Sequence, residues 1–193
     1  MNKEKLRKYI QSINSMPDEK AFELTVDFEY FLFPKHSFLI KENKIIKQTY
    51  FLETGYIRSF TFDKDGLEVT TNIYSAPCFV NDFFSFFKQL PAKQNFQTLT
   101  SCEGWAMSLE NVEKYFHNTQ EFREFGRLLV LNHYELLNER ILDMVKISAE
   151  SRYLKLLSNN PDVFQNVQLK IIASYLGITD TSLSRIRKEM FQK

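Results

Sequence analysis

The sequence predicts an α+β protein with a β-rich N-terminal part, one long helix and a C-terminal pair of short helices. Between positions 30 and 107, short runs of β-branched and aromatic residues alternate with turn residues, as antiparallel strands do. A stretch without proline or glycine follows Gly126 and continues to about Ile147, which predicts one long helix. The last residues have the spacing of two helices joined by a turn. We therefore expect three units, covering 1–117, 118–147 and 148–193.

The composition limits the class of protein. The 193 residues are 44% hydrophobic, which is typical of a globular chain with one sizeable domain or two small ones. No apolar run is long enough to cross a membrane, and the charged N-terminus lacks the apolar core of a secretory signal. Cys78 and Cys102 are too few for a disulfide framework. We therefore expect a cytoplasmic protein with reduced thiols.

Turn signals divide the N-terminal part into strands. Asp65-Gly66 lies between two strand-like runs and is a good hairpin signal, because tight hairpin turns need residues that accept positive φ. Several strands at this spacing are typical of an antiparallel barrel or sandwich. Most of the 19 phenylalanines precede residue 126, so we expect an aromatic core in this part.

Phenylalanines gather at one place in this part, at positions 79, 83, 84, 86 and 87. One interpretation is a short helix whose aromatic side chains fill the mouth of the barrel. The other is a pocket or patch for an apolar ligand or a partner, because concave aromatic surfaces bind small molecules. The two interpretations are compatible.

The long helix has a pattern that suggests an interface. Its residues at a spacing of three or four lie on one helix face. This face could form a coiled-coil-like seam between two protomers, with Asn132 as a buried polar residue that fixes the register. The alternative is a helix packed on its own barrel. We expect the dimer seam, at Phe125, Leu129, Asn132 and Leu136.

The C-terminal pair of helices has the features of a helix-turn-helix. Gly177 ends the first helix, and Thr179 is a good N-cap for the second. Each helix repeats apolar residues at a helical spacing, so each has one inner face. The inner residues are Leu169, Ile172, Ala173 and Leu176 in the first helix, and Leu183, Ile186 and Met190 in the second.

The outer face of the second helix is polar and basic, and such a helix fits the major groove of DNA. Arg185 is the best candidate for reading a base, because arginine pairs bidentately with guanine. A surface ion pair with Glu189 is the alternative. The expected DNA-binding residues are Thr179, Thr181, Ser182, Arg185 and Lys188.

The distribution of charge favours this hypothesis. From Lys146 onward the chain has 8 lysines and arginines against 4 aspartates and glutamates, whereas the residues before it have 17 against 20. A basic end suits contact with phosphates. The alternative is an ordinary pair of packed helices with a solvated face. Arg152 is expected to pack or pair near the domain junction rather than to touch DNA.

Motifs of catalysis are missing from the sequence. It contains no HExxH, GxSxG, phosphate-binding P-loop or CxxC pattern. We therefore expect no enzymatic activity and no metal site. Haem ligation by His36, His117 or His133 is the alternative to their ordinary role as structural or exposed side chains.

Two stretches of the chain resemble the Crp/Fnr family of bacterial transcription regulators, and in particular its short members in Bacteroidetes. They are ESRYLKLL with LKIIASYLGITDTSLSRIRKE near the C-terminus, and TYFLETGYIRSFTFDKDGLEVTTNIY with Gly55 at a strand turn. The resemblance implies a β-roll of the cyclic-nucleotide-binding type, a dimerisation helix, a homodimer and an inverted-repeat DNA site.

One segment departs from the pattern of the members that bind cyclic AMP. Those members have Gly-Glu, a short helix and Arg-Ser, where this chain has Asn81-Asp82 and Ala92-Lys93. An arginine fork can hold a cyclic phosphate, whereas Lys93 is only a point charge. We therefore expect no cyclic AMP binding, no bound cofactor and an unknown effector. The candidate pocket residues are Phe79, Asn81, Asp82, Phe83, Ala92 and Lys93.

The chain stops soon after the second helix, so we expect little or no wing of the kind that family members usually have. Contacts to DNA would then come from helix N-termini, Lys170, Arg187, Lys188 and the second subunit.

The sequence therefore predicts a homodimeric, sequence-specific regulator that binds double-stranded DNA, with RNA polymerase as a further partner and no membrane association. The rival hypothesis is a ligand- or protein-binding β-roll whose C-terminal helices serve assembly rather than DNA binding.

Overall fold

The computed structural model describes residues 2–191 and confirms the α+β fold. Two short helices begin the chain, α1 (Glu4–Ile13) and α2 (Asp18–Thr25), and they pack against each other. α1 is amphipathic, and its inner residues Leu6 and Ile10 are fully buried in the core of the β domain. Burial of these two side chains fixes α1 on the domain, at about 1.5–3 kcal/mol for each.

The strands form a β-roll of two four-stranded antiparallel sheets. The first sheet has the order β1-β8-β3-β6, and the second has the order β2-β7-β4-β5. Helix α3 (Phe83–Lys88) lies between β6 and β7 in the chain. The strands are β1 (Glu29–Phe33), β2 (Phe38–Ile40), β3 (Gln48–Thr54), β4 (Tyr56–Phe62), β5 (Glu68–Ser75), β6 (Cys78–Val80), β7 (Asn95–Thr98) and β8 (Cys102–Ser108).

The hairpin expected at Asp65-Gly66 is confirmed and joins β4 to β5. Gly66 has a φ of 78°, a conformation that costs glycine nothing. The carboxylate of Asp63 accepts hydrogen bonds from the backbone N–H groups of Asp65 and Leu67, both at 2.9 Å. The polar turn residues therefore close the hairpin through their own side chains.

The aromatic core is also confirmed. Phe51 and Phe86 are nearly inaccessible to solvent, and Phe79 packs on Phe51 with ring centroids 5.3 Å apart. Phe125 of the long helix contacts Phe79 at 5.6 Å. The long helix is therefore part of the core of the β-roll along its first turns.

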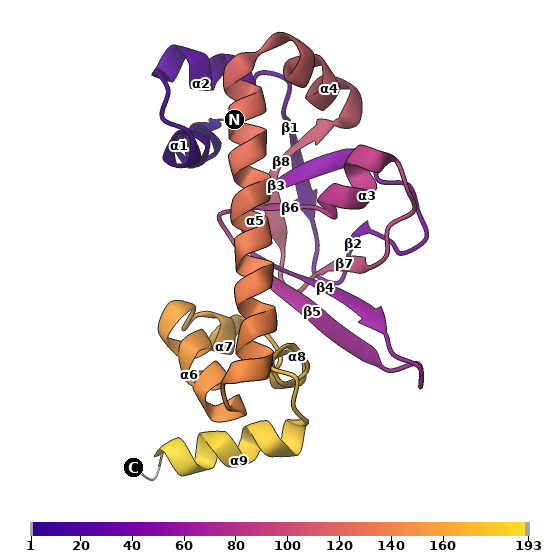
Figure 1. The fold of residues 1–193 in the computed structure, drawn as a ribbon, viewed down its shortest axis with the longest axis vertical. Helices are drawn as coiled ribbons and strands as arrows, with labels where there is room; N and C mark the ends of the chain where they lie inside the picture. Colours follow the sequence, from indigo (N-terminus) through magenta and orange to yellow (C-terminus); the bar gives the residue numbers. More distant parts are fainter. Residues whose placement is uncertain (1, 192–193) are drawn as a thin grey trace.

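Two helices follow the roll. α4 (Leu109–Asn118) begins at Ser108, whose hydroxyl accepts a hydrogen bond from the N–H of Asn111. α5 (Gln120–Lys146) is the long helix that the sequence predicts. It runs along the longest axis of the molecule, with both sheets on one side of it and the C-terminal helices at one end (Figure 1).

Four helices form the C-terminal part. They are α6 (Ala149–Asn159), α7 (Val163–Asn166), α8 (Leu169–Tyr175) and α9 (Asp180–Phe191). The pair α8 and α9 is the expected helix-turn-helix, and Gly177 between them has a φ of 69°. The residues Asn159-Asn160-Pro161 predict the end of the preceding helix and a loop over 161–167, but the structure has the short helix α7 within that loop.

The C-terminal helices share a second core with the β-roll. Leu183 and Ile186 of α9 pack with Ile172 of α8. Leu99, which follows β7, belongs to the same cluster and is only 4% exposed. The helix-turn-helix is therefore docked on the roll within one chain.

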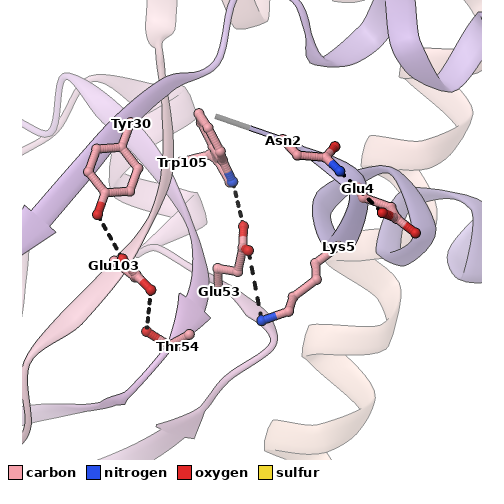
Figure 2. Close-up of polar contacts among 8 residues, drawn as sticks. All are labelled: Asn2, Glu4, Lys5, Tyr30, Glu53, Thr54, Glu103 and Trp105. Atoms are coloured by element: carbon pink, nitrogen blue, oxygen red, sulfur yellow. Dashed lines mark hydrogen bonds and ion pairs between the residues drawn. The ribbon is translucent and has the colours of Figure 1, made fainter.

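The N-terminal helix is tied to the outer side of the first sheet (Figure 2). The indole N–H of Trp105 donates to the carboxylate of Glu53 at 2.6 Å, and the ammonium of Lys5 lies 3.8 Å from the same carboxylate. Between the neighbouring strands β1 and β8, the Tyr30 hydroxyl donates to the carboxylate of Glu103 at 2.7 Å. The ion pair with Lys5 is exposed and contributes little, so the buried side chains of α1 carry the attachment.

The expected division at 117/118 and at 147/148 stays a prediction. The expectation of little or no wing falls partly on residues 192 and 193, which lie outside the described residues.

Candidate DNA-binding surface and candidate ligand cavity

The outward face of α9 begins with three hydroxyl groups. The Thr179 hydroxyl accepts a hydrogen bond from the N–H of Ser182 at 3.2 Å, as an N-cap does. Its oxygen also lies 2.9 Å from the Thr181 hydroxyl and 3.0 Å from that of Ser182. Thr179 is therefore occupied in starting the helix, whereas Thr181 remains on the exposed surface.

Arg185 and Lys188 continue this face, one and two turns after Thr181, and both are exposed. Within residues 2–191 Arg185 makes no ion pair, so the alternative pairing with Glu189 is not formed. Leu183 and Ile186, which are buried, hold the opposite face on α8. The structure thus presents the expected residues of α9 to solvent on a fixed helix.

Arg152 lies where the sequence analysis expects it, at the junction. Its guanidinium donates to the carbonyl oxygen of Leu176 at 3.0 Å and to that of Ile147 at 2.7 Å. These two carbonyl oxygens lie at the C-terminal ends of α8 and α5. Carbonyl groups at helix C-termini have no hydrogen-bond partner within their own helix. Arg140 of α5 adds a second link, because its guanidinium lies 4.0 Å from the ring centre of Tyr175.

The β-roll contacts the helix-turn-helix directly as well. The backbone N–H of Thr70 in β5 donates to the Ser174 hydroxyl of α8 at 2.8 Å. Tyr56 and Ile73 of the roll pack on the same core as Leu99. The orientation of α9 is therefore set both by α5 and by the second sheet.

The residues around α3 that are expected to form a pocket make contacts within the chain. The Asp82 carboxylate caps α3, accepting from the Ser85 N–H at 3.1 Å and from the Ser85 hydroxyl at 2.7 Å. Ala92 is 1% exposed, and the Lys93 ammonium lies over the ring of Phe84 at 5.7 Å. These contacts satisfy the polar groups of the segment within the chain.

Asn81 is the exception in this segment. It is 1% exposed, and its side-chain oxygen and nitrogen have no hydrogen-bond partner within the described residues. Of the six expected pocket residues, only Phe79 and Phe83 line the cavity described next. Asn81, Asp82, Ala92 and Lys93 do not line that cavity, and the pocket expected at these residues stays a prediction.

The cavity lies between α5, the roll and the C-terminal helices, and has a volume of about 330 Å³. His133 of α5 lies between two aromatic rings of its wall. Its ring is parallel to that of Tyr74, at 5° and 6.5 Å between centroids, and it meets the ring of Phe83 edge to face at 5.2 Å. Three elements of the fold, α5, β5 and α3, therefore meet at this histidine.

Burial determines the ionisation of these groups. Burial lowers the pKa of His133, although the carboxylate of Asp82 opposes this effect, so the imidazole is neutral at pH 7. Burial raises the pKa of the Tyr74 phenol to about 12. Burial likewise raises the pKa of the Cys78 thiol to about 12, which makes it a poor nucleophile.

The residues of the expected dimer seam differ in exposure, and Phe125 is the most buried of them. This side chain is 2% exposed and packs in the core of its own roll. Leu129 packs on the same core, and Asn132 and Leu136 line the cavity. Phe125 and Leu129 therefore pack on the roll of their own chain, whereas Asn132 and Leu136 are exposed. The dimer seam at these four residues stays a prediction.

The opposite face of α5 carries an apolar stripe that the sequence analysis missed. Its members recur at intervals of four, three, four and four residues, and each is at least 38% exposed. The heptad-like spacing could have been read from the sequence. The stripe consists of Val130, Tyr134, Leu137, Ile141 and Val145.

No helix of residues 2–191 is long and apolar enough to cross a membrane. Within the same range, no group of three or more histidine, cysteine, aspartate or glutamate residues could hold a metal ion.

The fold and the domain composition agree with known proteins. Residues 31–119 match the model of the cyclic nucleotide-binding domain. Over most of its length the chain has the fold of solved Crp/Fnr regulators. No curated protein matches the chain significantly.

Three solved structures illustrate the likeness of fold. FixK2 from Bradyrhizobium japonicum superposes with a TM-score of 0.72 at 14% identity, covering 86% of this chain and 85% of its own. CLP from Xanthomonas campestris, described as a c-di-GMP responsive global regulator, has a TM-score of 0.70 at 14% identity, covering 91% and 92%. A protein from Eubacterium rectale assigned to the Crp/Fnr family has a TM-score of 0.70 at 11% identity, covering 91% and 84%.

Proposed function

We propose that this protein is a sequence-specific DNA-binding regulator that acts as a homodimer. The observation that carries the proposal is the surface of α9, where Thr181, Arg185 and Lys188 are exposed on one face of a helix that the second core holds in place. An arginine without an ion-pair partner within residues 2–191 is ready to pair with a guanine edge. The Crp/Fnr fold supports the same function.

The stripe on α5 supports the homodimer. Monomeric proteins rarely expose a continuous row of large apolar side chains along one face of a helix. Tyr134, Ile141 and Val145 are 66%, 63% and 81% exposed, and they lie near the C-terminal half of α5. A second copy of α5 packed on this stripe would bury it twice across a two-fold axis.

The dimer has a geometric consequence for the DNA site. Two copies of α9 would enter successive major grooves about 34 Å apart. The bound sequence would then be an inverted repeat with half-sites about one helical turn apart. Arg152 and Arg140, which hold the ends of α5 and α8 together, would transmit any change in α5 to α9.

Cyclic AMP does not fit the segment around α3. A cyclic phosphate needs donors that are free to bind it, and the Ser85 N–H and hydroxyl at the start of α3 already donate to the Asp82 carboxylate. Ala92 offers no side-chain donor, and Lys93 lies over Phe84. The proposed regulator therefore does not respond to cyclic AMP.

The test is selection of binding sites from random double-stranded DNA, followed by fluorescence anisotropy at several salt concentrations. We expect enrichment of an inverted repeat and an affinity that falls as salt rises, because phosphate contacts release counterions. If no sequence is enriched and the salt dependence is flat, the C-terminal helices serve assembly, as the rival hypothesis holds.

A further inference from the structure

The turn between β2 and β3 forms part of a groove on the surface of the roll. The groove has a volume of about 330 Å³, and it is lined by residues 38–41, 44–48 and 50. The turn lies at the edge of the roll that faces away from α5 and α9 (Figure 1). The groove shares no lining residue with the cavity beside α5, and it is separate from the proposed DNA-binding surface.

The groove has an apolar floor and an apolar rim. Ile46 and Tyr50, which line it, are 4% and 8% exposed. Ile45 and Phe38, which line it as well, are 44% and 38% exposed and leave apolar surface to solvent. An apolar side chain of another molecule would be stabilised here, because it would remove this surface from water.

The turn beside the groove is held in place by hydrogen bonds to the segment after α3. The Asn43 N–H donates to the carbonyl of Ala92 at 2.8 Å, and the Ala92 N–H donates to the carbonyl of Lys44 at 2.9 Å. The side-chain amide of Gln89 donates to the carbonyl of Ile46 at 3.1 Å. Because these contacts form the groove before a partner arrives, binding requires little ordering of the chain.

Three exposed lysines line the groove, at Lys41, Lys44 and Lys47. None of them makes an ion pair within residues 2–191. Glu42, the one acidic residue among them in the sequence, accepts a hydrogen bond from the Asn95 amide instead. Residues 1–145 contain 17 lysines and arginines against 20 aspartates and glutamates, so this basic group lies in an acidic part of the chain.

The positive charges and the apolar surface of the groove lie close together. The Lys41 ammonium is 5.3 Å from the ring centre of Phe38. Ile45 forms a β-bridge with Pro91, and the neighbouring Leu90 is 44% exposed. A partner that matches both features carries an apolar side chain with carboxylates on either side of it.

We infer that this groove is a docking site for a short acidic segment of a partner protein, with an apolar side chain in the groove and carboxylates on the lysines. Nucleic acid phosphates would match the lysines but not the apolar floor, and a flat lipid surface would not fill a groove. The apolar side chain anchors the complex, and the complementary charges speed the encounter and select the partner. Docking here does not depend on the proposed DNA binding.

The test is isothermal titration calorimetry of the full chain with three synthetic peptides. The first is Gly-Asp-Glu-Trp-Glu-Asp-Gly, the second has glycine in place of tryptophan, and the third has asparagine and glutamine in place of the acidic residues. We expect the first to bind with a dissociation constant on the order of 10–100 μM and to bind more weakly as salt rises. The second and third should bind at least about tenfold more weakly than the first.

Variants place the peptide in the groove. Lys44→Glu should weaken binding of the tryptophan peptide by at least about tenfold, because it reverses a charge beside the groove. Lys64→Glu is the matched control, since Lys64 is also exposed but lies in the turn between β4 and β5. Ile45→Ser should weaken binding by about tenfold through lost apolar contact, whereas Leu32→Ser, at 59% exposure on β1, should not. Circular dichroism melting shows whether each variant is folded, and the exposed Lys44 keeps the test usable if Ile45→Ser is not.

Four results would overturn the inference. Three of them are no binding of the tryptophan peptide below millimolar concentration, equal binding of the glycine peptide, and equal losses in Lys44→Glu and Lys64→Glu. The fourth is cosedimentation with vesicles of phosphatidylcholine and phosphatidylserine that Lys44→Glu abolishes, which would assign the groove to an anionic membrane surface. Because no DNA is present in these experiments, a failure here leaves the proposed function untouched.

Discussion

The two faces of α5 differ in what covers them. One face places Phe125 in the core of the roll at 2% exposure, and the other exposes Ile141 at 63%. Both faces have apolar residues at helical spacing, so hydrophobicity does not distinguish them. The difference shows that a line of apolar residues on a helix indicates an interface with a second chain only where no other part of the same chain covers that line.

The same distinction separates the segment around α3 from the surface of α9. The Asp82 carboxylate has its partners within the chain, at the Ser85 N–H and hydroxyl. Arg185 makes no ion pair within residues 2–191. Polar side chains that have hydrogen-bond partners within the chain stabilise the fold. Polar side chains without such partners are available to another molecule.

The largest effect should follow a change on the covered face. Phe125→Ala should lower the free energy of unfolding by about 3–5 kcal/mol, because it leaves a cavity in the roll core. The measurement is urea denaturation followed by circular dichroism. Phe84→Ala, which removes an exposed ring, is the control and should change stability by about 0.5 kcal/mol or less. Similar losses in both variants would contradict the packing of Phe125.

A change on the uncovered face should act on assembly instead. Ile141→Glu should raise the dimer dissociation constant by about 100-fold or more, because it buries a carboxylate at the seam in each protomer. Leu136→Glu is closely matched, since Leu136 is 65% exposed on the other face, and it should leave the dimer intact. Analytical ultracentrifugation distinguishes the two, and a monomer formed by Leu136→Glu instead of Ile141→Glu would restore the original seam.

The next effect tests the open groups of α9. Arg185→Ala should cost about 1–3 kcal/mol on the selected site and relax the preference at one base pair in each half-site. Lys188→Ala should weaken binding to all sequences and reduce the slope of affinity against salt. Lys8→Ala, at the far end of the molecule, is the control in fluorescence anisotropy. An unchanged site preference in Arg185→Ala would remove Arg185 from base recognition.

A smaller effect is expected where the chain satisfies its own polar groups. Asp82→Ala should cost about 1 kcal/mol of stability, because it removes the N-cap of α3, and Asp82→Ser should recover most of this loss. Thermal melts give the stability of each variant. Calorimetry should detect no cyclic AMP binding to any of the three proteins, and micromolar binding would show that another group replaces the missing arginine.

The smallest effect concerns pH. Burial lowers the pKa of His133 below the value near 6.5 of an unfolded histidine, so the unfolded chain binds the proton more readily. The contribution of His133 to stability is therefore complete above pH 6.5 and declines as the pH falls towards the folded pKa. His133→Gln should flatten this part of the stability profile. An unchanged profile in His133→Gln would place the titration elsewhere.

The sequence predicts the fold well where the signals are local. Gly177 and the spacing of Leu183 and Ile186 predict the helix-turn-helix, and Asp65-Gly66 predicts the hairpin. The sequence does not predict the short helix α7. Packing of Val163 in the second core outweighs the preference of the preceding turn residues for a loop.

The parts that sequence reasoning misses depend on contacts between distant residues. Phe125 and Tyr134 both belong to apolar lines on α5, and only the position of the roll decides which line is covered. The cavity brings together Tyr74, Phe83 and His133, which lie on three different elements. No periodicity within one element could predict that meeting.

Leu99 has a consequence for protein engineering. This residue of the roll lies in the core of the C-terminal helices, with Ile172 and Leu183 around it. A fragment cut out after α5 would expose an apolar hole where Leu99 belongs. Chimeric regulators that exchange the C-terminal helices between relatives should therefore exchange the segment around Leu99 with them. The exchanged helices then keep the apolar side chain that fills their core.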